Sequence, residues 1–147
     1  MAMRARTYTS ACAMFANGAV DWATTDVRCL LLKSTYTYSA AHDFVDDVTA
    51  GSQEISVSGY TRADGDMVNF VAPTAANPSV CDSTSDITFT GLASGQTIGF
   101  VVFYIYNASD ASAALLFCMD EDTTTYPTNG GNFVVSLNAS GLFTVSV

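Results

Sequence analysis

Short runs of apolar, β-branched and aromatic residues, separated by turn-forming residues, are the feature that most limits what this 147-residue chain can fold into. The clearest runs are Val27–Lys33, Thr97–Tyr106 and Ala114–Met119. Runs of this length and composition predict strands, and the nearly continuous apolar character of Val27–Lys33 indicates burial on both faces. The spacing of runs and turns predicts an all-β fold, mainly antiparallel, of the sandwich or jelly-roll-like type.

One segment departs from the strand pattern. Between Ala40 and Ala50, the apolar residues Phe44, Val45 and Val48 lie one and four positions apart. In a helix this spacing places them on one face, which could be buried against the strands. We therefore expect one short helix in an otherwise β-rich fold.

The end of the chain predicts a β-hairpin. Phe133, Val135 and Leu137 alternate with other residues, as in a strand with one buried face. The segment Asn138–Gly141 supplies turn-forming residues, and Leu142–Val147 would be the returning strand.

Length and composition indicate a single structural domain over residues 1–147. Hydrophobic residues make up 49% of the chain and charged residues 13%, whereas a typical soluble domain has about 25% charged residues. Such a chain can bury a core, and its uncharged polar surface suits a subunit packed against neighbours. Residues 1–16 are a candidate N-terminal arm, in which Arg4 and Arg6 either contact an acidic partner or, as we expect, belong to a solvated flexible terminus.

The charge of the chain limits its partners. Fourteen acidic residues against five basic ones give a net charge of −9, which argues against a nucleic acid, since phosphates are bound by clustered Lys and Arg. The most apolar window, Phe100–Tyr106, is far too short for a membrane-spanning helix, and no signal-peptide pattern follows Arg4 and Arg6. We expect a soluble protein made in the cytoplasm, with no membrane partner.

Residues for enzyme chemistry are few. His42 beside Asp43 could begin a Ser-His-Asp arrangement, but adjacency does not make a triad and the sequence has no G-x-S-x-G motif. The acidic runs Asp46–Asp47 and Asp120–Asp122 lack the spacing of a calcium-binding loop, and we expect a solvated loop at Asp120–Asp122. We therefore predict a protein that is not an enzyme and holds no cofactor or metal.

The cysteines and tyrosines suggest different roles. The four cysteines form no C-x-x-C pair and are expected to be buried free thiols. Tyrosines in loops or at strand ends are candidates for a protein interface, since tyrosine buries area while keeping a polar group. The cysteines are Cys12, Cys29, Cys81 and Cys118, and the candidate interface tyrosines are Tyr36, Tyr38, Tyr60 and Tyr126.

Several short strings occur along the chain in a characteristic order. They are Gly18–Trp22, Asp26–Leu32 followed by Ser34–Thr37, His42–Val48, Glu54 followed by Gly59–Thr61, and Asn129–Phe133 followed by Gly141–Phe143. In this order and spacing they resemble a family of small structural proteins of tailed-bacteriophage virions. The resemblance implies architectural roles: Asp21 braces the entry to the first strand, Trp22 anchors it, and Gly59, Gly130 and Gly131 shape turns.

The same resemblance implies a function. It is that of a capsid decoration (cement) protein, which binds the lattice of the major capsid protein on the capsid exterior and stabilises the mature head. Self-association into a trimer or another symmetric homo-oligomer would follow from the lattice symmetry. The alternative is a vertex spike, head fibre or minor tail component that recognises the host surface, in which Tyr36, Tyr38 and Tyr126 would stack on glycan rings.

Overall fold

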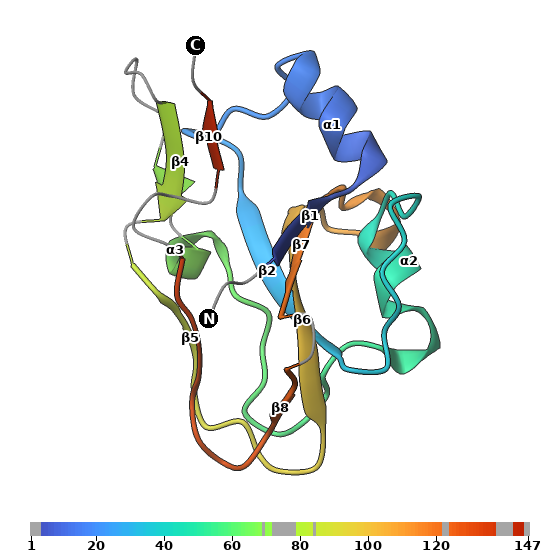
Figure 1. Ribbon diagram of the computed structural model, residues 1–147, viewed down its shortest axis with the longest axis vertical. Helices are drawn as coiled ribbons and strands as arrows, with labels where there is room; N and C mark the ends of the chain where they lie inside the picture. Colours follow the sequence, from blue (N-terminus) through green and yellow to red (C-terminus); the bar gives the residue numbers. More distant parts are fainter. Residues whose placement is uncertain are drawn as a thin grey trace.

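The computed structural model describes residues 4–68, 70–71, 79–83, 85–121, 124–137 and 143–145. Over these residues the chain consists mainly of antiparallel strands with a few short helices, which confirms the predicted all-β class (Figure 1). The strands are β1 (Arg4–Thr7), β2 (Val27–Lys33), β3 (Phe70–Val71), β4 (Ser79–Ser83), β5 (Ile87–Phe89), β6 (Thr97–Ile105), β7 (Leu115–Asp120), β8 (Tyr126–Pro127), β9 (Phe133–Val135) and β10 (Phe143–Val145). The helices are α1 (Thr9–Ala16), α2 (Val45–Thr49) and α3 (Gly65–Val68), with 3₁₀ turns η1 (Ala50–Ser52) and η2 (Asp110–Ser112).

The central sheet has the strand order β1-β7-β6-β2, and β8 pairs with the beginning of β6. Leu30, Leu31 and Leu32 in β2 are all fully buried. Because successive side chains of a strand point to opposite faces, this confirms that β2 is covered on both faces. Figure 1 shows α2 on one side of the sheet and α3 with β5 on the other.

The N-terminal segment is part of the fold from residue 4 onward, so the expected flexible arm is wrong for residues 4–16. β1 pairs antiparallel with β7, with Arg4 opposite Asp120. The side chains of Arg4 and Arg6 both form ion pairs with Asp120, at 2.8 and 2.7 Å. Tyr8, between β1 and α1, is fully buried. A strand ladder, two ion pairs and a buried ring together fix this segment to the sheet.

The predicted C-terminal hairpin is also wrong. β9 pairs with β5, with Val135 opposite Ile87, whereas β10 pairs with β4. The predicted turn, Asn138–Gly141, lies outside the described residues. Alternation of apolar residues indicates a strand but carries no information about its partner. Val135 and Ile87, which lie opposite each other, are both buried.

The predicted helix is present as α2, but one of its apolar residues is not buried. Val45 and Val48 are fully buried, whereas Phe44 is 40% exposed. Phe44 precedes the helix with extended backbone angles, φ −128° and ψ 164°, so helical spacing does not apply to its side chain. The carboxylate of Asp47 accepts hydrogen bonds from the backbone N–H groups of Asp43 and Phe44, which satisfies donors at the start of the helix and lowers the pKa of Asp47.

Candidate interaction surfaces

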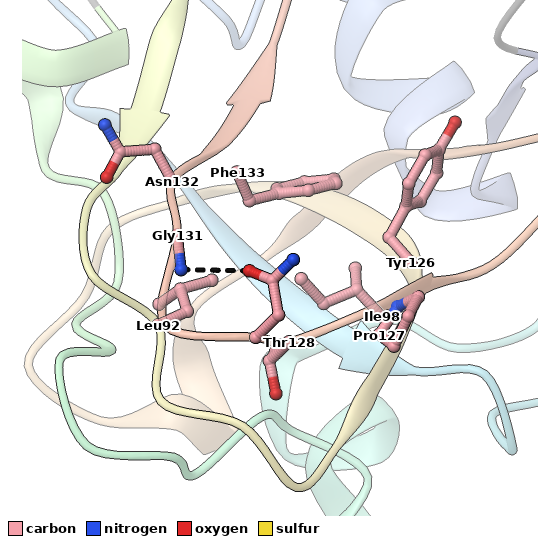
Figure 2. Close-up of a pocket in the computed structure, with 9 residues that line it drawn as sticks. Leu92, Ile98, Tyr126, Pro127, Thr128, Gly131, Asn132 and Phe133 are labelled. Carbon is pink, nitrogen blue, oxygen red and sulfur yellow. Dashed lines mark hydrogen bonds between the residues drawn. The ribbon is translucent and has the colours of Figure 1, made fainter.

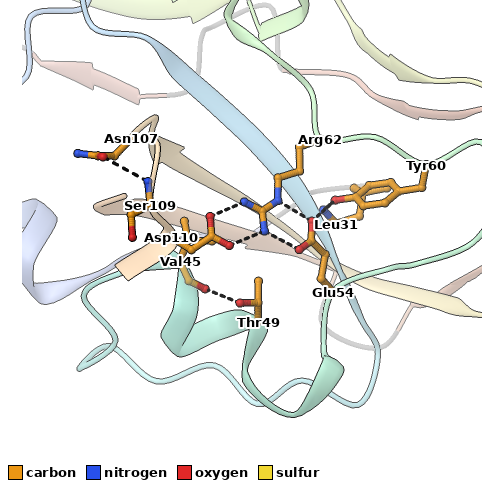
Figure 3. A network of polar contacts seen from close by, with 9 residues as sticks. All are labelled: Leu31, Val45, Thr49, Glu54, Tyr60, Arg62, Asn107, Ser109 and Asp110. Atoms are coloured by element: carbon orange, nitrogen blue, oxygen red, sulfur yellow. Dashed lines mark hydrogen bonds and ion pairs between the residues drawn. The ribbon is translucent and has the colours of Figure 1, made fainter. Parts of the chain in front are cut away.

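Tyr60 joins three segments that are separate in the sequence. Its hydroxyl donates to Glu54 Oε1 at 2.9 Å and accepts from the backbone N–H of Leu31 at 3.1 Å (Figure 3). Burial of the ring, with the nearby Glu54 charge, raises the pKa of Tyr60. The phenol therefore stays neutral and links the loop before it to the central strand β2.

Arg62 connects this junction to the loop after β6. Its guanidinium donates to both oxygens of Glu54, at 2.7 Å each, and to both oxygens of Asp110, at 2.7 and 2.9 Å. Figure 3 shows Arg62 between the two carboxylates. These hydrogen bonds lower the pKa of Asp110 and raise that of Arg62. Two bidentate pairs on one guanidinium form a rigid brace, which the sequence analysis did not identify.

Tyr36 and Tyr38 lie together with Tyr8 rather than on an exposed loop surface. Tyr36 is buried, with its ring edge against Phe100 at 5.1 Å between centroids. The ring of Tyr38 lies 5.3 Å from that of Tyr8, and its hydroxyl donates to the carbonyl of Thr7. Tyr36 is therefore unavailable for stacking on a ligand, because it belongs to the core beside the N-terminal segment.

His42 takes part in this same cluster. Its Nδ1 is 3.0 Å from the hydroxyl of Tyr36, which in turn lies 3.5 Å from the hydroxyl of Tyr8. The ring nitrogen is thus engaged with a tyrosine, and in the described residues neither Asp43 nor a serine is recorded as its partner. The geometry gives no support to a Ser-His-Asp arrangement at His42.

Asp21 and Trp22 form a second, separate group. The Asp21 carboxylate accepts from the backbone N–H of Ala23 and from the hydroxyl of Thr24, both at 3.0 Å. Trp22 is partly buried against the core, and its ring lies 5.8 Å from that of Phe15 in α1. Asp21 therefore closes the turn before β2, and Trp22 holds that turn against the helix.

Tyr126, Gly130 and Gly131 belong to a third group, in the segment between β8 and β9. Tyr126 is partly buried beside Phe133, and Gly130 has a φ of +89°, which favours glycine. The backbone of this segment is bonded to Leu92: Gly130 N donates to Leu92 O, and Leu92 N donates to Gly131 O. The eight residues singled out from the sequence thus lie in several places, and this last group adjoins a pocket.

Three large apolar side chains are exposed among the described residues: Phe44 by 40%, Tyr106 by 44% and Val134 by 48%. Phe44 precedes α2, Tyr106 follows β6, and Val134 lies on β9, which pairs with β5 on the opposite side of the sheet from α2 (Figure 1). The guanidinium of Arg28 lies 3.4 Å from the centre of the Tyr106 ring. Single exposed apolar residues are common on protein surfaces, so these three do not by themselves mark an interface.

The charges of the described residues leave acidic groups at the surface. All five basic residues are engaged within the chain: Arg4 and Arg6 with Asp120, Arg28 with Asp26, Arg62 with Glu54 and Asp110, and Lys33 with the carbonyl of Ser52. Exposed carboxylates lie at Asp21, Asp43, Asp46, Asp47, Asp64 and Asp86. This arrangement favours a basic or neutral partner surface over a polyphosphate.

The acidic runs do not come together as a metal site in the part of the chain that the structure describes. No group of three or more His, Cys, Asp or Glu side chains is arranged there to hold a metal ion. Asp120 is buried under Arg4 and Arg6, and Asp122 lies outside the described residues. None of the described helices is both long and apolar enough to cross a membrane.

The cysteines lead to a testable difference in reactivity. Cys29 and Cys118 are buried free thiols, as predicted, whereas Cys12 is exposed and the side chain of Cys81 lies outside the described residues. Burial raises the pKa of Cys118 to about 12 and also raises that of Cys29. With iodoacetamide at about pH 8, we expect Cys12 to react in the folded protein while Cys29 and Cys118 react only after denaturation. Peptide mapping by mass spectrometry measures this, and equal labelling of Cys12 and Cys29 in the folded state would contradict the burial of Cys29.

No protein-family model, curated protein or solved structure matches this chain.

Proposed function

We propose that this protein is a decoration (cement) subunit on the exterior of a tailed-bacteriophage capsid, where it binds the major capsid protein. The observation that carries the proposal is the junction at Tyr60. The strings around Leu31, Glu54 and Tyr60 resemble the phage family separately, and one hydroxyl connects all three. Three of the strings that carry the resemblance are therefore neighbours in the fold.

A subunit with several neighbours would contact them through separate surface groups. Exposed apolar side chains at Phe44, before α2, at Tyr106, after β6, and at Val134, on β9, are candidates for such contacts. A protein that sits across junctions between lattice subunits buries surface on more than one of them, which requires contacts on several faces. The excess of exposed carboxylates would complement basic patches on the lattice and orient the subunit as it docks.

Such binding would stabilise the capsid by mass action. A protein that binds the expanded lattice, and not its precursor or dissociated subunits, shifts the equilibrium towards the expanded state in proportion to its occupancy. Lattice symmetry places copies around local axes, so we propose that the bound protein forms a trimer or another symmetric cluster.

The proposal predicts the consequence of deleting the protein. Phage that lack it should assemble heads that rupture at a lower temperature, and adding back the purified protein should restore the original rupture temperature. Quantitative mass spectrometry of intact virions should give a copy number similar to that of the major capsid protein. A copy number close to that of the vertices or of one tail ring, with an unchanged rupture temperature, would contradict the cement role and favour a spike, head-fibre or tail component.

A further inference from the structure

A pocket of about 250 Å³ lies beside the segment that connects β8 to β9 (Figure 2). Its apolar lining includes Leu92 and Ile98, and two aromatic side chains, Tyr126 and Phe133, lie against it. The loop that closes the pocket is fixed in place, because Gly130 N donates to Leu92 O at 2.7 Å and Leu92 N donates to Gly131 O at 3.0 Å. These backbone hydrogen bonds hold the loop in place, so the pocket is already formed without a movement of the loop.

The aromatic rings at the pocket are held by their neighbours. The rings of Tyr126 and Phe133 lie 5.4 Å apart at an interplanar angle of 59°, and both are partly buried. Phe133 continues into the core through Phe89, at 6.4 Å between ring centroids. The Tyr126 hydroxyl is hydrogen-bonded to the carboxylate of Glu121, outside the pocket lining. Two rings fixed at an angle offer ring surface to the aliphatic face of a small ligand.

Two asparagine side chains border the same pocket, and both are held by backbone hydrogen bonds. Asn129 Oδ1 accepts from Gly131 N at 2.9 Å, the hydrogen bond dashed in Figure 2, and Asn132 Oδ1 accepts from Gly91 N at 3.1 Å. These bonds orient both amides with their oxygens toward the backbone. Within the described residues, the amide nitrogen of Asn129 donates to no protein acceptor, so it keeps its N–H donors for a ligand, whereas the Asn132 amide points away from Tyr126 and Phe133 (Figure 2).

The lining contains no charged side chain, and its volume is slightly below the range of about 300–1,000 Å³ that is usual for drug-sized ligands. A ligand that fits is therefore small, uncharged, and apolar on one face with hydrogen-bonding groups at its edge. We propose that this pocket binds one ring of a neutral saccharide. The C–H face of the sugar lies against Tyr126 and Phe133, and one of its hydroxyl oxygens accepts a hydrogen bond from the amide of Asn129. The proposal is independent of the capsid role, since a decoration subunit could lack it and a host-binding subunit could have it.

The test uses the full chain labelled with ¹⁵N and followed by NMR during titration with glucose, galactose, N-acetylglucosamine and their β-linked disaccharides. We expect at least one of these sugars to cause saturable shifts of the Gly130, Gly131 and Leu92 amides, with a dissociation constant of about 1–10 mM. N-acetylneuraminate, which is acidic, should bind at least about tenfold more weakly because the site has no cation and lies near Glu121.

Two variants examine the two halves of the site. Tyr126→Ala removes one ring, and Asn129→Asp keeps the acceptor for Gly131 N but replaces the amide donor with a carboxylate oxygen. Each should weaken binding by about tenfold or more, whereas Tyr106→Ala, which removes an exposed tyrosine elsewhere, should leave it unchanged. Asn129→Asp gives an answer even if Tyr126→Ala does not fold. The proposal is overturned if none of the neutral sugars gives saturable shifts up to about 100 mM. Equal binding by wild type and Asn129→Asp would also overturn it.

Discussion

Replacing Arg62 with methionine should lower the free energy of unfolding by about 3 kcal/mol. Methionine fills much of the same space, but it leaves Glu54 and Asp110 without their common cation. The side chain of Glu54 is only 21% exposed and is also bonded to the hydroxyl of Tyr60, so its unpaired charge would remain poorly solvated. The lost brace would loosen the loop that connects Tyr60 to β2. Urea unfolding followed by circular dichroism measures the change.

Arg28→Met is the matched control for this experiment. Arg28 also forms an ion pair, with Asp26, but the side chains are 28% and 42% exposed and only two residues apart. Water can solvate the carboxylate that remains, so the loss should be below about 1 kcal/mol. Equal losses for Arg62→Met and Arg28→Met would show that Arg62 contributes no more than a surface ion pair.

Replacing Gly59 with alanine should destabilise the protein by about 3 kcal/mol or more. Gly59 has a φ of +88°, and an added Cβ would lie 2.4 Å from the carbonyl oxygen of Gly91. A positive φ alone costs a side chain about 1–2 kcal/mol, and the rest of the effect comes from pushing the backbone at Gly91 away. Thermal unfolding measures the loss.

Gly130 offers a control with nearly the same backbone conformation and no steric contact. Its φ is +89°, and an added Cβ would have nothing within 4 Å. Gly130→Ala should therefore lose only about 1 kcal/mol, which isolates the backbone term. If the two alanine variants lose the same stability, the close approach of Gly59 to Gly91 does not affect stability.

The strands that could be predicted from the sequence are those whose own residues show burial. The run Val27–Lys33 gave β2 with its observed bounds, because three consecutive leucines require cover on both faces. The β1 segment could not be predicted in this way, since the reason that it is ordered lies at Asp120, more than a hundred residues away. The predicted C-terminal hairpin failed for the same reason: the partner of a strand is a non-local property.

The environment of each candidate residue is also set by segments distant in the sequence, so it could not be predicted from residue type. Tyr36 and Tyr126 are equivalent by residue type, but Phe100 covers Tyr36, whereas Tyr126 lines a pocket. The string Asn129–Phe133 was noted for its glycines, and the amide of Asn129 became relevant only when the turn around Gly131 placed it. The sequence contained one indication that Arg62 is structurally important, because it is a lone arginine close to Tyr60 in a chain with few charges. Nothing in the sequence linked Arg62 to Asp110.

The order of strands in the central sheet has a consequence for synthesis of the protein. β2 pairs with β6, with Val27 opposite Ile105, and β1 pairs with β7, so both strands are synthesised long before their partners. At roughly 5–20 residues per second, the leucine-rich β2 therefore leaves the ribosome several seconds before its partner exists. Pairings between such distant segments form slowly, on a scale of about milliseconds to seconds even after release. During that interval the nascent chain exposes an apolar, unpaired strand, and a ribosome that stalls before β6 would leave a fragment that cannot form this sheet and is prone to aggregate.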